Sequence, residues 1–389
     1  MRRLSIVRSL LAVGVVFAAG CGQPTPAPAP ATTPAPAPPS GPRLYVTDEP
    51  GGKLIVVDTS SGQIIETIAV GKRPRGVHIS RDGKQLLVAL SGSPIAGPGV
   101  DESKLPPPDR SADGIGIVDL ASHKVIKVLN GGPDPESFDI SLDGSLVYAS
   151  NEDAAEMSVI DVATATVKHR VKVGEEPEGV TLRPDGQVVY ITCEGDNAVY
   201  AIDTTSLNVL AKIPTGERPR SIVFTGDNKV GFVGGENAGN VTVFDATTHM
   251  VLKTIKILAA AGPGGGGAPK AAPARGEAGR GEAGRGRGDG AVPPRPMGLV
   301  MSPDGTRVYV SNGRAGSVSV IDVAQRTLIA TYEGIGARVW GITISADGKT
   351  LYTANGPTAG DVSFVDAGTG AVLKKVVVGG GPWGLAIAK

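Results

Sequence analysis

The chain has 389 residues, and its 38 basic side chains equal its 38 acidic ones, so the formal net charge at pH 7 is zero. This balance gives no electrostatic reason to expect nucleic acid or an anionic membrane surface as a partner. The 56 glycines and 31 prolines indicate many tight turns, which favours a fold built from short strands.

Residues 1–21 have the pattern of an export signal. Three arginines lie within residues 2–8, an apolar core follows at 10–17, and Ala-Ala-Gly-Cys at 18–21 forms a small-residue cleavage site. The cysteine directly after the glycine resembles a bacterial lipobox, although an Ala stands where such motifs usually carry Leu. We therefore predict that Cys21 is lipidated and that the protein is an exported, membrane-anchored lipoprotein facing the periplasm or the cell surface. The alternative is an ordinary cleaved signal.

Residues 22–42 consist mostly of Pro, Ala and Thr, and this composition predicts a semi-extended linker. The chain has two cysteines. If Cys21 carries lipid, Cys193 is the remaining thiol and no intrachain disulfide forms.

From about Arg43 to the last residue, seven copies of one segment follow each other. Each copy has an aromatic or apolar residue in a short strand, an Asp about 13 residues later except in the copy that the first insertion lengthens, and then an Asp-Gly-type turn. The aromatic or apolar strand residues are Tyr45, Leu87, Tyr148, Tyr190, Phe232, Tyr309 and Tyr352. The matching aspartates are Asp58, Asp119, Asp161, Asp203, Asp245, Asp322 and Asp366. A repeat of about 42 residues with four short strands is typical of a propeller blade. We predict an all-β fold over 43–389: a seven-bladed β-propeller of four-stranded antiparallel blades.

The two ends of this region predict how the ring closes. Residues 384–388 read as the first strand of a blade, and residues 43–47 read as the second strand of another. One C-terminal strand is therefore expected to pair with three N-terminal strands, which removes exposed sheet edges. The repeated aspartates are interpreted as turn formers, because Asp side chains bond the backbone N–H groups that follow them.

Several short motifs carry a family resemblance. Tyr-Ala-Ser-Asn at 148–151, Tyr-Val-Ser-Asn at 309–312 and Ser-Pro-Asp-Gly at 302–305 resemble the YVTN-type bacterial β-propeller repeat. The resemblance implies a seven-bladed ring that is often exported. It implies little about chemistry, because members of that family share shape more than activity.

Two insertions interrupt the repeat, at about 91–113 and 259–293. The first falls between the second and third strands of a blade, and the second falls between consecutive blades, so both are expected on one face of the ring. The second insertion has almost no apolar side chains, which predicts disorder.

The residue after the usual Pro at the start of each blade varies around the ring. In chain order the series is Arg75, Glu136, Glu178, Arg220, Met297, Trp340 and Trp383. Both tryptophans of the chain occupy this position, in adjacent blades, with Arg75 next in ring order and Arg338 two residues before Trp340. Because tryptophans beside arginines can stack on a flat ligand, we predict a ligand site at Trp340, Trp383, Arg75 and Arg338. The alternative is that each Trp caps its blade.

The third positions of the same strands include two polar residues from neighbouring blades, His78 and Asp139. They are weak candidates for acid–base work, and a polar pair between blades is the alternative. No metal site and no cofactor are predicted, because no haem, zinc or phosphate-loop motif occurs.

The sequence leaves catalysis open and favours a non-catalytic binding or scaffold propeller of the bacterial cell envelope. Its expected partner is an envelope protein or a glycan, recognised on the face that carries both insertions, and its expected membrane contact is the lipid on Cys21. The alternative is a redox or cofactor-associated accessory protein or enzyme with a site over the central channel.

Overall fold

The computed structural model describes residues 41–95, 104–258, 292–356 and 360–388. The predicted export signal with Cys21, nearly all of the linker, residues 96–103 of the first predicted insertion and nearly all of the second lie outside these residues. In the part of the chain that is described, no helix is long and apolar enough to cross a membrane.

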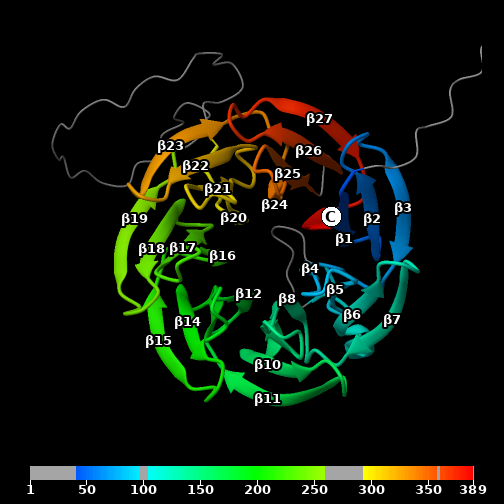
Figure 1. Ribbon diagram of the computed structural model, residues 1–389. Helices are drawn as coiled ribbons and strands as arrows, with labels where there is room; N and C mark the ends of the chain where they lie inside the picture. The colour runs from blue at the N-terminus through cyan, green and yellow to red at the C-terminus, as the bar shows by residue number, and fades with distance from the viewer. Residues whose placement is uncertain (1–40, 96–103, 259–291, 357–359, 389) are drawn as a thin grey trace, which may run out of the picture. The chain divides into compact units, whose positions relative to one another are not determined.

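The described residues form seven four-stranded antiparallel sheets arranged in a ring (Figure 1). From the channel outward, the blades are β28 (Pro382–Ala388), β1 (Arg43–Asp48), β2 (Lys53–Asp58), β3 (Ile64–Ala69); β4 (Val77–Ile79), β5 (Gln85–Leu90), β6 (Gly114–Asp119), β7 (Lys124–Leu129); β8 (Pro135–Ile140), β9 (Leu146–Asn151), β10 (Glu156–Asp161), β11 (Thr166–Lys172); β12 (Pro177–Leu182), β13 (Val188–Cys193), β14 (Ala198–Asp203), β15 (Val209–Pro214); β16 (Pro219–Phe224), β17 (Val230–Gly235), β18 (Asn240–Asp245), β19 (Val251–Lys256); β20 (Leu299–Met301), β21 (Arg307–Ser311), β22 (Val318–Asp322), β23 (Thr327–Tyr332); and β24 (Val339–Ile344), β25 (Thr350–Asn355), β26 (Asp361–Asp366), β27 (Val372–Val377). Two single 3₁₀ turns, η2 (Arg110–Ala112) and η3 (Glu152–Ala154), lie in loops. The predicted seven-bladed propeller is confirmed.

The predicted closure is confirmed as well. Strand β28 pairs antiparallel with β1, from Arg43 opposite Ala388 to Asp48 opposite Pro382. The Thr47 hydroxyl accepts a hydrogen bond from the Gly384 N–H at 2.7 Å, so this contact joins the two ends of the ring. The first blade therefore holds the last strand of the chain.

The apolar core lies between the blades. Seven clusters of buried side chains each draw on two adjacent sheets. In one of them, Tyr45 and Leu54 of the first blade pack with Val77 and Leu86 of the second. Because one sheet cannot bury both of its faces alone, each blade depends on both neighbours.

All seven aspartates at the ends of the third strands act as turn formers, as predicted. Each side chain accepts a hydrogen bond from the backbone N–H three residues later, at 2.7 or 2.8 Å. The Asp-Gly turns behave in the same way: the Asp82 carboxylate accepts from the Lys84 N–H, and Gly83 has φ +72°. These carboxylates have structural partners, so they are not candidates for a site.

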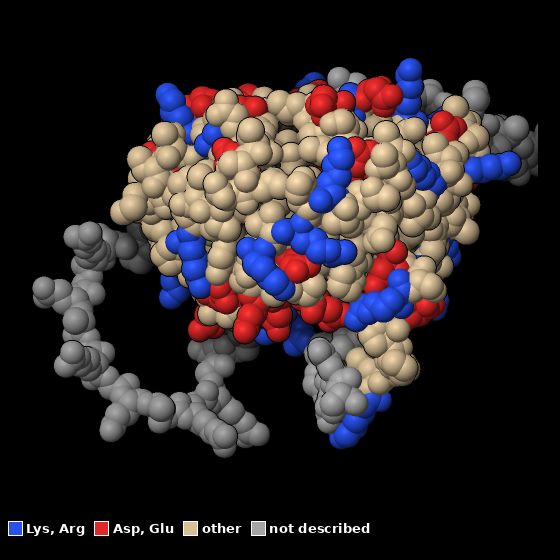
Figure 2. Space-filling view, turned by 90° about the horizontal axis from the view of Figure 1, so that it is seen from below, with Lys and Arg blue, Asp and Glu red and all other residues tan. Residues whose placement is uncertain are grey.

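The two faces of the ring differ. Second and fourth strands run in the same direction, so the loops after β5 and after β19, where the two insertions begin, leave from one face. We call this the loop face, and the opposite one the turn face. Seen edge-on, acidic side chains gather along both rims, while most of the outer wall between them is uncharged (Figure 2). The carboxylates of the turn face are explained by the turns, whereas those of the loop face need another explanation.

Candidate functional site

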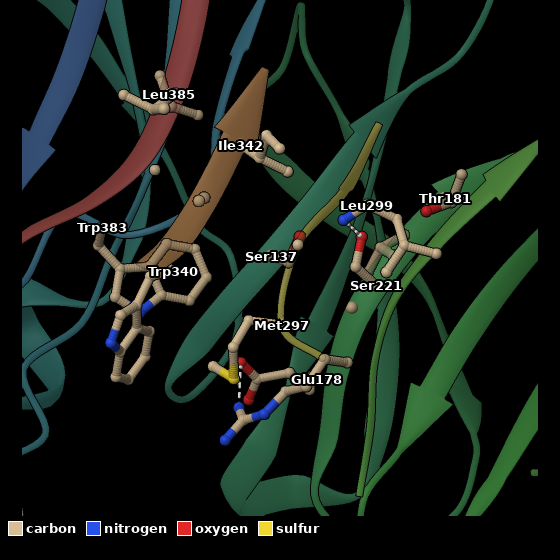
Figure 3. A pocket seen from close by; sticks show the side chains of 18 of the residues that line it. Ser137, Glu178, Thr181, Ser221, Met297, Leu299, Trp340, Ile342, Trp383 and Leu385 are labelled. Carbon is tan, nitrogen blue, oxygen red and sulfur yellow. Dashed lines mark hydrogen bonds and ion pairs between the residues drawn. The ribbon is translucent and has the colours of Figure 1, made fainter. Parts of the chain in front are cut away.

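Seven side chains surround the opening of the central channel on the loop face. They are the residues at the start of the inner strands, and we call them the mouth ring: Arg75, Glu136, Glu178, Arg220, Met297, Trp340 and Trp383. A cavity of about 300 Å³ lies within the channel and is lined by Glu178, Arg220, Met297, Trp340 and Trp383, among others (Figure 3).

In several blades, a side chain of the second strand fixes the mouth residue of the next blade. Hydroxyl groups of the second strands donate to its carbonyl oxygen: Ser150 to Glu178 at 2.7 Å, Thr192 to Arg220 at 3.0 Å, and Ser311 to Trp340 at 2.5 Å. The mouth side chains are therefore held on a rigid inner ring rather than on free loops.

A glycine follows the mouth residue in five blades. A Cβ at these glycines would lie 2.1 to 3.1 Å from the carbonyl oxygen of the next mouth residue, at Gly76, Gly179, Gly298, Gly341 and Gly384. The inner strands thus approach backbone to backbone, which only glycine allows at these contacts.

This close approach predicts that Gly179→Ala destabilises the ring. The added Cβ would lie 2.1 Å from the Arg220 carbonyl oxygen, which belongs to the backbone and cannot rotate away. Overpacking of this kind costs about 1–3 kcal/mol, measurable as a lower urea midpoint. The matched control is Gly226→Ala, since nothing lies within 4 Å of its Cβ position. An unchanged midpoint in Gly179→Ala would contradict the contact.

The structure brings together the four residues that the sequence predicts as a ligand site. The ring centroids of Trp340 and Trp383 are 6.2 Å apart with an interplanar angle of 52°, and the two indoles lie side by side at the cavity (Figure 3). The Arg338 guanidinium carbon is 4.4 Å from the Trp340 ring centroid, and that of Arg75 is 5.4 Å from the Trp383 centroid. That these side chains bind a ligand stays a prediction.

The two indole N–H groups have unused hydrogen-bonding capacity. Nε1 of Trp340 and Nε1 of Trp383 are both buried, and neither has a hydrogen-bond partner among the described residues. A buried donor without an acceptor costs about 1–3 kcal/mol. An oxygen-bearing ligand in the cavity would supply the missing acceptors.

Arginines and glutamates fill the other side of the mouth. Arg220 contacts three carboxylates from two adjacent blades: Glu178 at 2.7 Å and Glu194 at 2.6 Å from one, and Glu236 at 2.9 Å from its own. Its side chain is only 12% exposed. Arg295 adds a further ion pair to Glu236 at 2.9 Å. Arg220 therefore acts as the central cation of a buried network.

Arg75 belongs to a second network on the opposite side. Its guanidinium pairs with Glu49 at 3.1 Å and with the fully buried Glu136. Arg73 pairs with Glu49 at 3.2 Å and lies 3.9 Å from Asp134. The charge of Arg75 is thus already balanced by protein carboxylates.

Two glutamates of the loop face bind protons more tightly than usual. Burial raises the pKa of Glu152 to about 7, and the Glu178 carboxylate adds to this effect. Burial also raises the pKa of Glu194 to about 8, again with Glu178 as the next cause, although Arg220 and Arg218 lower it. The acidic part of the mouth is therefore crowded with more carboxylates than its arginines fully compensate.

Three carboxylates in this region lie close enough to hold a cation. Oxygen atoms of Asp134, Glu136 and Glu152 all lie within 4.8 Å of one another. Hard cations such as Ca²⁺ bind sets of carboxylate oxygens. However, Arg75 already pairs with Glu136, and the Ser91 hydroxyl donates to Asp134, so these carboxylates have partners within the protein.

His78 and Asp139 both line the cavity, but no hydrogen bond or ion pair joins them in the described structure. Asp139 accepts hydrogen bonds from the backbone N–H of Leu182 at 2.8 Å and from Arg81 at 3.1 Å. Burial lowers the pKa of His78, and its ring contacts Phe138 at a centroid distance of 5.1 Å. A catalytic role for the pair stays a prediction.

Sequence reasoning missed the charged networks. Four glutamates of this region recur at one repeat position, directly after the second strand: Glu49, Glu152, Glu194 and Glu236. Four acidic residues at the equivalent position of four blades were the available signal. Arg73 and Arg75, which pair with Glu49, and Arg220, which pairs with Glu194, come from the neighbouring blade, so the pairing itself needed the structure.

The comparisons support the fold. Residues 46–221 match the family described as the Choice-of-anchor I domain. A structure of Kuenenia stuttgartiensis hydrazine synthase is similar with a TM-score of 0.60 and 18% identity, over 80% of this chain and 88% of that one. A functionally unknown protein from Desulfotomaculum acetoxidans DSM 771 is similar with a TM-score of 0.67 and 13% identity, over 90% and 99%. At these identities the likeness shows the fold alone, and no curated protein matches the chain.

Proposed function

We propose that this chain is an exported, lipid-anchored propeller that binds a cell-envelope glycan or partner protein at the mouth ring without catalysing a reaction. The observation that carries the proposal is the tryptophan pair, whose buried N–H groups lack acceptors at a cavity of about 300 Å³. Concave sites with aromatic walls and a few polar groups are typical of ligand binding.

A glycan suits these side chains better than a flat protein surface. The cavity volume lies at the lower end of the range that is usual for small-molecule pockets. This volume suits one sugar unit of a glycan chain that continues outward. The C–H face of a sugar ring can pack on Trp340 or Trp383, and its hydroxyl oxygens can accept from the indole N–H groups. A partner protein would instead insert one side chain there.

The anchoring part of the proposal rests on residues 1–42. The basic, apolar and small-residue segments that end at Cys21 support export and lipidation, and the family description at 46–221 names an anchor. The mass of the mature N-terminus tests this part, because a lipid on Cys21 adds acyl chains that a simple cleaved signal lacks.

The redox or cofactor-associated alternative has one observation in its favour. His78 and Asp139 face the same cavity as the tryptophans. A cofactor or metal retained by protein purified from its own host, together with an activity lost in His78→Ala at unchanged stability, would favour this alternative over the binding module.

A pull-down from an envelope extract tests the binding function. We expect the wild-type chain to retain a glycan or protein that the double variant Trp340→Ala/Trp383→Ala fails to retain. Arg170→Met is the surface control, because this side chain is 44% exposed on the outer strand β11. Retention that is equal in all three proteins, with equal thermal stability, would remove the mouth ring as the site.

A further inference from the structure

The arginines of the loop face fall into two groups. Six of them pair with carboxylates: Arg73, Arg75, Arg110, Arg218, Arg220 and Arg295. Two others, Arg314 and Arg338, form no ion pair within the described ranges of the chain. Both unpaired arginines belong to the same sector of the ring, since Arg314 lies in the loop after β21 and Arg338 directly precedes β24.

Arg338 is partly buried, and its surroundings are positive. Burial lowers the pKa of Arg338, and the charge of Arg314 lowers it further. Glu236 opposes this with a smaller effect, and Arg295 and Arg220 each lower the pKa by less than Glu236 raises it. A guanidinium that is removed from water without a carboxylate partner is costly. This sector therefore carries positive charge that the described protein groups leave uncompensated.

The same guanidinium lies at the aromatic pair. Its carbon is 4.4 Å from the Trp340 ring centroid, and the Trp340 N–H lacks an acceptor. Arg75 differs although it also lies against a tryptophan, because Glu49 and Glu136 neutralise it. An incoming anion would thus meet free donors at Arg338 and Arg314, but not at Arg75.

We propose that Arg338 and Arg314 form an anion subsite beside Trp340, and that its occupant is the carboxylate of an acidic sugar stacked on the tryptophan pair. This inference rests on the proposed glycan-binding function and names the class of glycan. A guanidinium matches a carboxylate with two parallel N–H···O bonds. A sugar with a single negative charge fits better than a doubly charged phosphate ester, because the acidic part of the mouth, where Glu178 already raises the pKa of Glu152, repels further negative charge.

Quenching of tryptophan fluorescence tests the subsite without any sugar. The chain has only two tryptophans, both in the mouth ring, so all indole emission reports on this site. Each quenching constant is divided by the one that the same quencher gives with free N-acetyltryptophanamide, because iodide and caesium differ in intrinsic efficiency. Because a local positive potential concentrates anions, we expect the normalised quenching by iodide to be about threefold stronger than that by caesium, with acrylamide as the neutral reference for access. In Arg338→Met/Arg314→Met the difference should disappear, whereas Arg170→Met should keep it. Equal iodide and caesium quenching in the wild-type chain would overturn the subsite.

Three matched sugars then test the ligand class: glucose, glucuronic acid and glucosamine, which differ in one neutral, acidic or basic group. We expect glucuronic acid to bind about tenfold more tightly than glucose, and the arginine double variant to lose this preference while it still binds glucose. Equal binding of glucose and glucuronic acid would overturn the acidic-sugar assignment and leave glycan binding intact. If none of the three sugars binds, both the acidic-sugar assignment and glycan binding as the proposed function are contradicted. The iodide result would then support only the anion subsite.

Discussion

Replacing Arg220 with methionine should destabilise the ring by about 3–5 kcal/mol at neutral pH. The substitution removes the one cation that contacts all three of Glu178, Glu194 and Glu236 at 2.6 to 2.9 Å. Among the described residues it leaves the buried Glu178 without an ion pair, whereas Glu194 keeps Arg218 and Glu236 keeps Arg295. Breaking a buried ion pair by removing one partner has this cost, because the remaining charge loses its compensation. Urea unfolding, followed by circular dichroism, measures the change.

The cost of Arg220→Met should also depend on pH. The pKa of Glu194 is already raised to about 8 by burial and by Glu178, and removing Arg220 raises it further. The pKa of Glu236, which Arg220 helps to lower against the effect of burial, should rise as well. Unfolded glutamates ionise near their ordinary value of 4.5, so the folded variant holds protons that the unfolded chain releases. Its stability therefore falls as pH rises above about 4.5, and the difference from the wild type is smallest below that pH.

Two controls isolate this effect. Arg170→Met removes an exposed arginine, 3.4 Å from Glu156, and should change stability by less than about 0.5 kcal/mol. Adding Glu194→Gln to Arg220→Met removes one of the carboxylates that Arg220 contacts, and it should recover part of the lost stability. A destabilisation that is constant between pH 4 and pH 8 would contradict the electrostatic origin, because lost packing does not titrate.

Deleting residues 382–389 should unfold most of the ring. The deletion removes β28, which supplies the inner strand of the first blade and pairs with β1 along nearly its whole length. It also removes Leu385 and Ile387 from a core cluster shared with the neighbouring blade. Lost strand pairing and lost burial together cost on the order of 5 kcal/mol or more, which is comparable with the whole stability of a domain.

Complementation provides the control for this deletion. A synthetic peptide with the sequence of residues 380–389 should restore a cooperative thermal transition, and the same peptide with Leu385→Asp should not. A truncated chain that melts within about 2 °C of the intact one would show that the ring does not need β28 for closure.

The fold was predictable because the same strand pattern recurs seven times. Strand order around a propeller follows chain order, so equivalent repeat positions become neighbours in space. This is why the adjacency of Trp340, Trp383 and Arg75 followed from the repeat alone, and why the turn role of aspartates such as Asp58 and Asp161 was evident.

The charge pattern of the mouth was not predictable in the same way. Arg75 and Arg338 occupy similar places beside a tryptophan, yet one is neutralised by Glu49 and Glu136 and the other has no described carboxylate partner. The difference depends on how far long side chains reach across blade boundaries. Repeat spacing places backbones and says little about which charged groups meet.

Tryptophan emission during titration with envelope glycans is the most direct test that the mouth ring is the binding site. Both tryptophans of the chain lie in this ring, so any ligand that stacks there must change their emission. We expect a saturable change whose midpoint agrees with the dissociation constant measured by calorimetry, and whose affinity falls at least about tenfold in Trp340→Ala. A glycan that binds by calorimetry while emission stays constant, and that binds Trp340→Ala equally well, would place the site elsewhere and contradict the account.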